Sequence, residues 1–165
     1  MIQTLFIIKF IFPFVLLAVF FALYRKPYKW LQRFYIRMAL LPSARRFYSL
    51  VLLITLIILN WCCFETDHNY AVAVSTCMTV PFAFRKLAEA ILLRLHDHKR
   101  FLLLTLMSSL IFYTIPYMNS IFLVVYVASV AAQFYPSGKI LGITKAPGFK
   151  CTKEELTTLI QKYYF

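Results

Sequence analysis

The segment FYSLVLLITLIILNWCCF, residues 47–64, contains eighteen residues and no charged side chain. A helix needs about 20 mostly apolar residues to cross the ~30 Å hydrocarbon core of a bilayer. The whole 165-residue chain shows the same bias, with 62% hydrophobic and 15% charged residues, against about 45–50% and about 25% in soluble domains. Residues 47–64 therefore predict a transmembrane helix.

Four further apolar runs flank this segment, at residues 4–24, 70–84, 101–117 and 121–135. The runs at 70–84 and 121–135 are shorter than a typical span, but a bilayer can thin locally around short helices. We therefore expect residues 1–135 to form a small all-α integral membrane bundle with about five transmembrane helices. Three spans with two re-entrant hairpins are the alternative.

The positive charges are segregated along the chain, which carries 18 Lys and Arg, 6 Asp and Glu, and a net charge of +12. Seven basic residues and no acidic residue lie in 25–46, and five basic residues lie in each of the segments 85–100 and 136–165. The connection 65–69 carries acidic residues instead. Five spans place the three basic segments on one side, which is the cytoplasmic side by the positive-inside rule. The pattern predicts an N-terminus outside and a C-terminus inside.

Residues 27–41 are predicted to form an amphipathic helix on the cytoplasmic side. Lys29, Arg33 and Arg37 recur every four residues along it. Such helices lie in the headgroup plane and are attracted to anionic lipid. We expect Lys29, Arg33 and Arg37, together with Trp30, to dock on lipid or on a partner. The apolar face of this helix is predicted at Trp30, Phe34, Met38 and Leu41.

Two more amphipathic helices are expected on the same side, at residues 84–96 and 153–164. The second follows a capping box, Thr152 to Glu155, within a cytoplasmic tail at 136–165. A helix this short is marginal alone, so we expect its apolar face to dock on this protein, on lipid or on a partner. The docking residues of that face are Leu156, Leu159, Ile160 and Tyr163.

Four residues inside the predicted spans are candidates for a role within the bilayer: Lys9, Pro13, Pro81 and Pro116. The stem of Lys9 is long enough to reach the outer headgroups. Each proline leaves the carbonyl four residues earlier without its usual donor. Broken helices with polar neighbours form midplane sites in transporters, whereas small hydroxylated residues also allow close helix packing. We favour headgroup contact for Lys9 and packing for the hydroxyls.

The sequence shows no motif for catalysis, cofactor binding or metal binding. Three glycines leave no phosphate-binding loop, and the four cysteines form no C-x-x-C pair. His96 and His98 flank Asp97, but residues two apart on a helix point to nearly opposite sides. We therefore expect a solvated turn there, and we predict that the protein is not an enzyme and holds neither cofactor nor metal.

These observations favour a non-catalytic subunit or accessory factor of a larger membrane assembly, of the secretion, conjugation or respiratory type. The expected location is a bacterial inner membrane, or else an organellar inner membrane. The expected partners are bilayer lipids, including anionic headgroups, and other membrane subunits or further copies of the chain. Nucleic acid is not expected, because lipid would cover the aromatic faces of the basic segments.

Two alternatives remain open at this stage. The first is an oligomeric pore or a membrane-acting defence, toxin or immunity factor, in which Lys9 and Pro13 would line a conduit. The second is a small transporter with a site near Pro81 and Pro116.

Overall fold

The computed structural model describes residues 2–23, 28–67, 69–115, 117–145 and 158, apart from the side chains of residues 2–6, 8, 9 and 145. The regular structure of the described residues is entirely helical, without strands, so the all-α prediction is confirmed. The helices are α1 (Ile2–Leu23), α2 (Lys29–Leu40), α3 (Pro42–Asp67), α4 (Tyr70–Ala83), α5 (Arg85–Asp97), α6 (Lys99–Thr114), α7 (Asn119–Gln133) and α8 (Gly138–Lys145).

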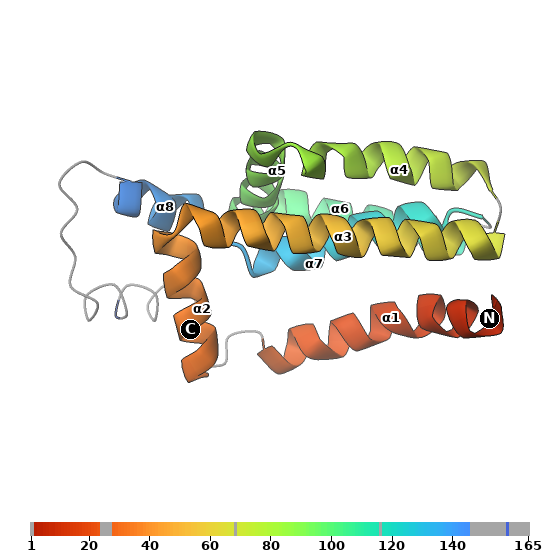
Figure 1. Cartoon of the computed structure of the whole chain (residues 1–165), viewed down its shortest axis with the longest axis horizontal. Coiled ribbons are helices and arrows are strands. Elements are labelled where there is room, and N and C mark those ends of the chain that lie inside the picture. The colour runs from red at the N-terminus through yellow and green to blue at the C-terminus, as the bar shows by residue number, and fades with distance from the viewer. Residues whose placement is uncertain (1, 24–27, 68, 116, 146–157, 159–165) are drawn as a thin grey trace.

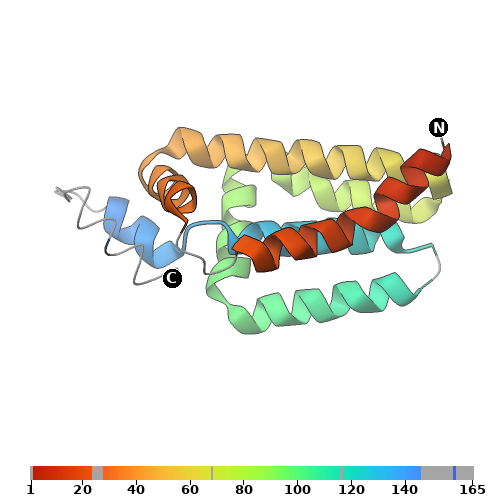
Figure 2. The ribbon, with the colours of Figure 1, turned by 90° about the horizontal axis from the view of Figure 1, so that it is seen from below.

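Five helices, α1, α3, α4, α6 and α7, run side by side along the long axis of the molecule (Figure 1). The shorter helices α2 and α5 cross this axis at one end, and α8 lies at the same end (Figures 1 and 2). We call it the basic end, because α2, α5 and α8 carry most of the described Lys and Arg residues. The far end holds the start of α1 and the α3–α4 and α6–α7 connections.

Prolines explain several helix boundaries. Pro42 is the first residue of α3, a position that suits proline because no N–H is needed there. Consequently α3 begins before the predicted run 47–64 and includes Arg45 in its first residues. At the other end of the bundle, Ile115 is extended and α6 ends at Thr114, as expected for a residue that precedes a proline. We had predicted that Pro116 would lie inside the apolar helix 101–117. That prediction is wrong, because α6 ends before it, at Thr114.

Helix α7 forms the centre of the bundle and contacts α1, α3, α4, α5 and α6. Most of its residues are buried, among them Leu123, Val127 and Ala132. Helix α6 lies at the periphery, and Ser109 is its buried residue in the described chain. The second half of α7 is rich in Ala, Ser and Val, and small side chains allow neighbouring helices to approach closely.

Large apolar side chains cover much of the outside of the long helices, and the mainly apolar core also contains hydroxyl groups. The hydroxyl-bearing side chains of Ser75 and Ser109 are fully buried. On the outside of the long helices, Phe47 is 70% exposed and Leu103 is 65% exposed, and further large apolar side chains are exposed on α1, α3, α4 and α6. Monomeric soluble proteins rarely expose large contiguous apolar patches.

By length and composition, one described helix, α3, qualifies to cross a membrane. Helices α7 and α8 qualify as a second only if this pair, bent by 48°, is one broken span and not a re-entrant loop. Helices α4, α6 and α7 rise only about 21–24 Å at 1.5 Å per residue, less than the ~30 Å of the hydrocarbon core. Length and composition together thus support one or two spans in the described residues, and the predicted five are not confirmed.

Candidate functional site

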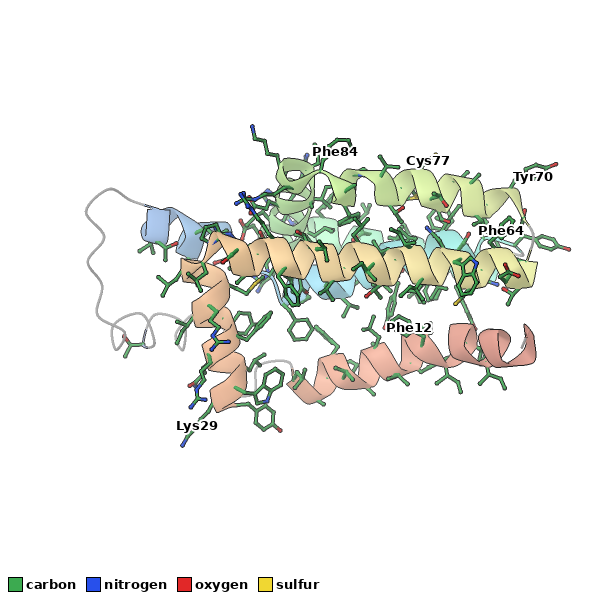
Figure 3. All side chains as sticks on the ribbon, viewed as in Figure 1. Phe12, Lys29, Phe64, Tyr70, Cys77 and Phe84 are labelled. Atoms are coloured by element: carbon green, nitrogen blue, oxygen red, sulfur yellow. The ribbon has the colours of Figure 1, made fainter. Side chains whose placement is uncertain are left out.

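Helix α2 presents the residues predicted to dock on lipid or on a partner. Lys29, Arg33 and Arg37 are exposed, and Trp30 is 55% exposed beside them. Figure 3 shows Lys29 at the start of α2, with its ammonium group directed away from the bundle. The structure thus places three cations and an indole ring on the outer side of a helix that crosses the basic end.

The buried face of α2 is turned relative to the predicted one. Leu31, Tyr35 and Met38 are buried on a helix that contacts α3 and α8. Trp30 and Leu41, both predicted to belong to the apolar face, are exposed. Helical spacing identifies apolar stripes, but two adjacent stripes fit this sequence, and only the packing against α3 and α8 selects one of them.

Arg45, near the start of α3, holds α2 against the bundle. Its side chain is buried, and its Nη1 donates to the carbonyl oxygens of Met38 and Ala39 at 3.0 and 3.2 Å. These carbonyls lie in the last turn of α2, where intrahelical donors are missing. The Nε of Arg45 lies 3.5 Å from Oε1 of Glu89 on α5, and the same oxygen lies 3.7 Å from Nε of Arg85. One buried guanidinium therefore connects α2, α3 and α5.

Tyr135, which follows α7, completes this charged cluster. Its side chain is fully buried, and burial raises its pKa. The negative charge of Glu89 raises this pKa further, and the positive charges of Arg45 and Arg85 oppose the rise in part. The phenol therefore stays neutral, and the two guanidinium groups remain the counter-charges of Glu89. Because removal of one partner would leave a buried charge unpaired, the cluster is suited to hold helices in place.

Two polar side chains from other helices contact carbonyl groups at the C-terminal end of α7. The Tyr48 hydroxyl of α3 donates to the carbonyl of Ala131 at 2.7 Å. On α5, Nδ1 of His96 lies 3.0 Å from the carbonyl oxygen of Ala132. The last carbonyls of a buried helix need donors of this kind. The turn predicted to be solvated is exposed at Asp97 and His98, whereas His96 is half-buried against the end of α7.

Asp97, the last residue of α5, positions α8. Its Oδ1 and Oδ2 lie 3.2 and 3.1 Å from the amide nitrogen of Gly138, the first residue of α8, where the helix dipole favours a negative charge. A Cβ atom at position 138 would lie 2.5 Å from Oδ2 of Asp97, so a larger residue there would displace the carboxylate from this position. Residues 136–165 were predicted to form a tail, and helix α8 was not expected there.

One cavity, which we call the α1–α6 groove, has a volume of about 720 Å³ and lies between α1, α6 and α7. Its walls are mostly apolar. Tyr126 of α7 lines it and donates from its hydroxyl to the carbonyl of Pro13 at 3.3 Å. Pro13 thus lies in the wall of this groove, whereas the side chain of Lys9 lies outside the described part of the chain. The lining residues include Phe10, Phe14, Leu106, Leu110, Tyr113 and Phe122.

A smaller cavity of about 320 Å³, which we call the α3–α4 groove, contains an incompletely paired amide. Asn60 of α3 is 6% exposed, and its Oδ1 accepts a hydrogen bond from the hydroxyl of Ser75 on α4 at 2.8 Å. Its Nδ2 has no hydrogen-bond partner among the described residues. The lining residues are Ile57, Asn60, Trp61, Phe64, Val72, Thr76 and Thr79.

The predicted proline sites are not brought together. Pro81 lies in the last turn of α4 beside α5, whereas α6 ends at Thr114 at the far end and Pro116 lies outside the described residues. The hydroxyl near Pro81, that of Thr79, donates to a carbonyl of its own helix at 2.7 Å, a bond that satisfies it locally. In the described ranges, no group of three or more His, Cys, Asp or Glu side chains is placed to hold a metal ion.

The predicted docking helix at 153–164 lies outside the described residues, except for Thr158, which is helical and exposed. Its candidate residues Leu156, Leu159, Ile160 and Tyr163 are therefore not placed. The surfaces that the structure does place as candidates for docking are the outer side of α2 and the two grooves.

A scan against protein-family models and searches among curated proteins and among solved structures found no match to this chain. Function is therefore inferred from the arrangement of the chain's own residues. Three features carry this inference: the apolar exterior, the charges gathered at the basic end, and the docking surfaces just described.

Proposed function

We propose that this chain is a membrane-embedded, non-catalytic subunit or accessory factor of a larger membrane assembly, with the five long helices as its spans. The observation that carries the proposal is the apolar exterior of the long helices, on which Leu103 and Ile111 are exposed, while hydroxyls such as those of Ser75 and Ser109 are buried between helices. In water, exposed apolar surface costs about 25 cal/mol per Å². In hydrocarbon that cost vanishes, and small polar residues at helix contacts are favourable.

Exposed aromatic side chains support the same placement. In the described chain, exposed Trp and Tyr residues lie towards the two ends of the bundle, as in the aromatic belts of membrane proteins. Residues 47–64 of α3, which include Trp61, rise about 26 Å, close to the ~30 Å of a hydrocarbon core. The residues are Tyr28 and Trp30 at the basic end, and Trp61, Tyr70, Tyr113 and Tyr117 towards the far end.

The charge distribution orients the bundle. Described basic residues beyond α1 lie on α2, α5 and α8 and in the first turns of α3 and α6, whereas Glu65 and Asp67 lie at the far end. Because Lys and Arg favour cytoplasmic loops, the basic end faces the cytoplasm and the start of α1 lies outside. This orientation is compatible with a bacterial inner membrane or an organellar inner membrane.

The short helices are compatible with a bilayer for separate physical reasons. Helix α7 is surrounded by α1, α3, α4, α5 and α6, and irregular or short backbone is tolerated at membrane depth where protein covers it. At the start of α6, Lys99 and Arg100 have stems that can extend to the headgroups. Helix α4 continues at Phe84 into α5, and local thinning of the bilayer costs only a fraction of a kcal/mol per Å, roughly.

The subunit role is supported by the way α2 is held. Arg45 fixes the end of α2 by two hydrogen bonds, while Lys29, Arg33 and Trp30 face outward. Basic residues near an anionic membrane surface contribute about 1 kcal/mol each. We propose that α2 rests on the cytoplasmic headgroups and contacts a neighbouring subunit there.

The membrane placement is tested at Met107, which lies midway along α6 and is 57% exposed. Met107→Lys is expected to disfavour insertion by roughly 3 kcal/mol, the cost of a lysine at the centre of a span, and so to deplete the protein from carbonate-washed membranes. The control Met107→Leu should behave like the parent chain. A Met107→Lys protein that folds and accumulates as the parent does would contradict the proposal, because a water-exposed site tolerates this change within about 0.5 kcal/mol.

The subunit role is tested by photo-crosslinking in native membranes. A photoreactive residue at position 30, on the outer side of α2, should form a discrete adduct with a protein. The same residue at position 103, on the outer side of α6, should form adducts with lipid. Lipid adducts at both positions would contradict the subunit role and leave the membrane placement standing.

A further inference from the structure

The α1–α6 groove opens onto the apolar exterior of the bundle. Helix α1 packs on α3 and α7, and α6 packs on α5 and α7, so the groove lies over α7 between the two outer helices. Both outer helices run along the long axis of the molecule (Figure 2). Phe14 of α1 and Leu110 of α6 line the groove and are also exposed on the outside. The groove is therefore continuous with the surface that the membrane placement assigns to lipid.

The polarity of the groove changes along its length. On α7 its lining runs from Asn119, the first residue of this helix, to Tyr126, a distance of about 10 Å. The part next to the far end contains the amide of Asn119 and the phenol of Tyr113, whereas Leu17 and Leu106 line the inner part. A bilayer lipid has the same order of polarity, because its headgroup lies in the polar interface and its acyl chains extend into the hydrocarbon core.

The deeper polar groups of the groove are already paired within the chain. The hydroxyl of Ser109 donates to the carbonyl of Leu106 at 2.7 Å, and that of Tyr126 donates to the carbonyl of Pro13 at 3.3 Å. Among the described lining residues none is charged. A polar occupant would leave its own groups without partners at this depth, which is unfavourable. A hydrocarbon chain has no such groups, so the lining favours it.

The size of the groove argues against a transmembrane helix as the occupant. A helix with its side chains is about 10–12 Å wide, so a 10 Å length of it fills roughly 800–1,100 Å³. The groove has a volume of about 720 Å³, within the range of small-molecule sites, about 300–1,000 Å³. A spanning helix would also continue past the inner limit of the groove at Leu17 and Leu106, whereas a flexible acyl chain can end there.

We propose that the α1–α6 groove binds one phospholipid of the outer leaflet, with an acyl chain between α1 and α6 and the headgroup at the level of Asn119. The site rests on the membrane placement and orientation proposed above, which put the far end outside. An empty gap would deprive the facing walls of van der Waals contacts, and an acyl chain restores them. The lipid thus joins α1 to α6 as part of the bundle and exchanges more slowly than lipid on the outer surface.

The lipid is tested by native mass spectrometry of the protein released into mild detergent from vesicles of dioleoyl phosphatidylcholine. The parent chain is expected to retain one phospholipid. Leu110→Trp places a larger side chain in the groove and should lower the retained fraction about tenfold, since overpacking costs about 1–3 kcal/mol. The control Ile111→Trp, exposed on the same helix outside the groove, should retain lipid as the parent does.

A second pair of variants tests the opposite wall. Leu17→Trp, which lies in the groove, should lower retention, whereas Val19→Trp, exposed on α1 outside the lining, should not. Equal retention within either pair, or an inserted parent chain that carries no lipid, would overturn the lipid site and leave the membrane placement intact. A parent chain that carbonate removes from the vesicles would overturn both.

Photo-crosslinking identifies the occupant directly. A leucine-sized diazirine residue is placed at position 110 or at position 103, and the protein from native membranes is irradiated after exchange into lipid-free detergent. Position 110 should still form a phospholipid adduct, whereas position 103, on the outer side of α6, should have lost its lipid. A discrete protein adduct at position 110, or equal lipid adducts at both positions, would overturn the lipid site.

Discussion

Helices α6 and α7 are neighbouring apolar helices of sixteen and fifteen residues, yet they occupy opposite environments. Most of α7 is buried, whereas Leu103 and Leu104 of α6 are 65% and 62% exposed. The side chains account for this difference. Helix α6 is rich in Leu, while the second half of α7 contains small residues such as Ala128 and Ser129. Small side chains let several helices approach one axis closely, and long apolar side chains are suited to face lipid.

Hydropathy does not distinguish an apolar helix at the centre of the bundle from an apolar helix at its surface. Hydropathy finds both helices, because both are apolar, but it does not tell which of them lies at the centre. Side-chain size carries that information, since only a helix with small side chains can be surrounded at close range. Three pairs of variants test this distinction. In each pair, one substitution changes α7 or a residue that contacts its C-terminal end, and the other changes α6.

The largest effect is expected at Ala132, which is fully buried in α7. Ala132→Phe should destabilise the bundle by roughly 3 kcal/mol, because extra volume in a packed interior displaces its neighbours. Leu104→Phe, on the exposed side of α6, should stay within about 0.5 kcal/mol of the parent. The measurement is the temperature at which half of the purified protein remains monodisperse in mild detergent. Equal midpoints for the two variants would show that α7 is not the packed centre.

A smaller effect is expected at Ser129, where α7 touches α6. Its hydroxyl is buried, donates to the carbonyl of Val125 at 2.7 Å, and lies 3.4 Å from Oγ1 of Thr105. Ser129→Leu should cost roughly 2 kcal/mol through overpacking, measured by the same thermal midpoint. Ser108→Leu, at a half-buried position of α6, serves as the matched control. If Ser108→Leu were the more damaging change, the contact between the two helices would be misplaced.

The smallest effect is expected at the end of α7. Tyr48→Phe removes the donor to the carbonyl of Ala131 and should cost roughly 0.5–1 kcal/mol, the usual contribution of one hydrogen bond in a membrane protein. Tyr113→Phe, on an exposed tyrosine of α6, should leave the midpoint unchanged. A Tyr48→Phe protein as stable as the parent would mean that other groups satisfy the Ala131 carbonyl.

Much of the helical layout could be predicted, because apolar runs bounded by charges and prolines are local features. The run predicted at 70–84 corresponds to α4 (Tyr70–Ala83), and the run at 121–135 overlaps α7 (Asn119–Gln133). Less of the candidate site could be predicted. Arg45 pairs with Glu89, and Asp97 contacts Gly138. Both contacts join residues far apart in the chain, so no local sequence pattern predicts them.

The sequence by itself determined that the chain is helical, which of its segments are apolar, and that its positive charges gather in three segments, because each of these follows from neighbouring residues. The tertiary structure decided that α7 is surrounded, that α2 packs through Leu31 and Tyr35 rather than Trp30, and that Asn60 is left with an unpaired amide atom. These outcomes depend on which helix faces meet. That choice is made by the shape and hydrogen bonding of side chains brought together from distant parts of the chain, which spacing along one helix does not encode.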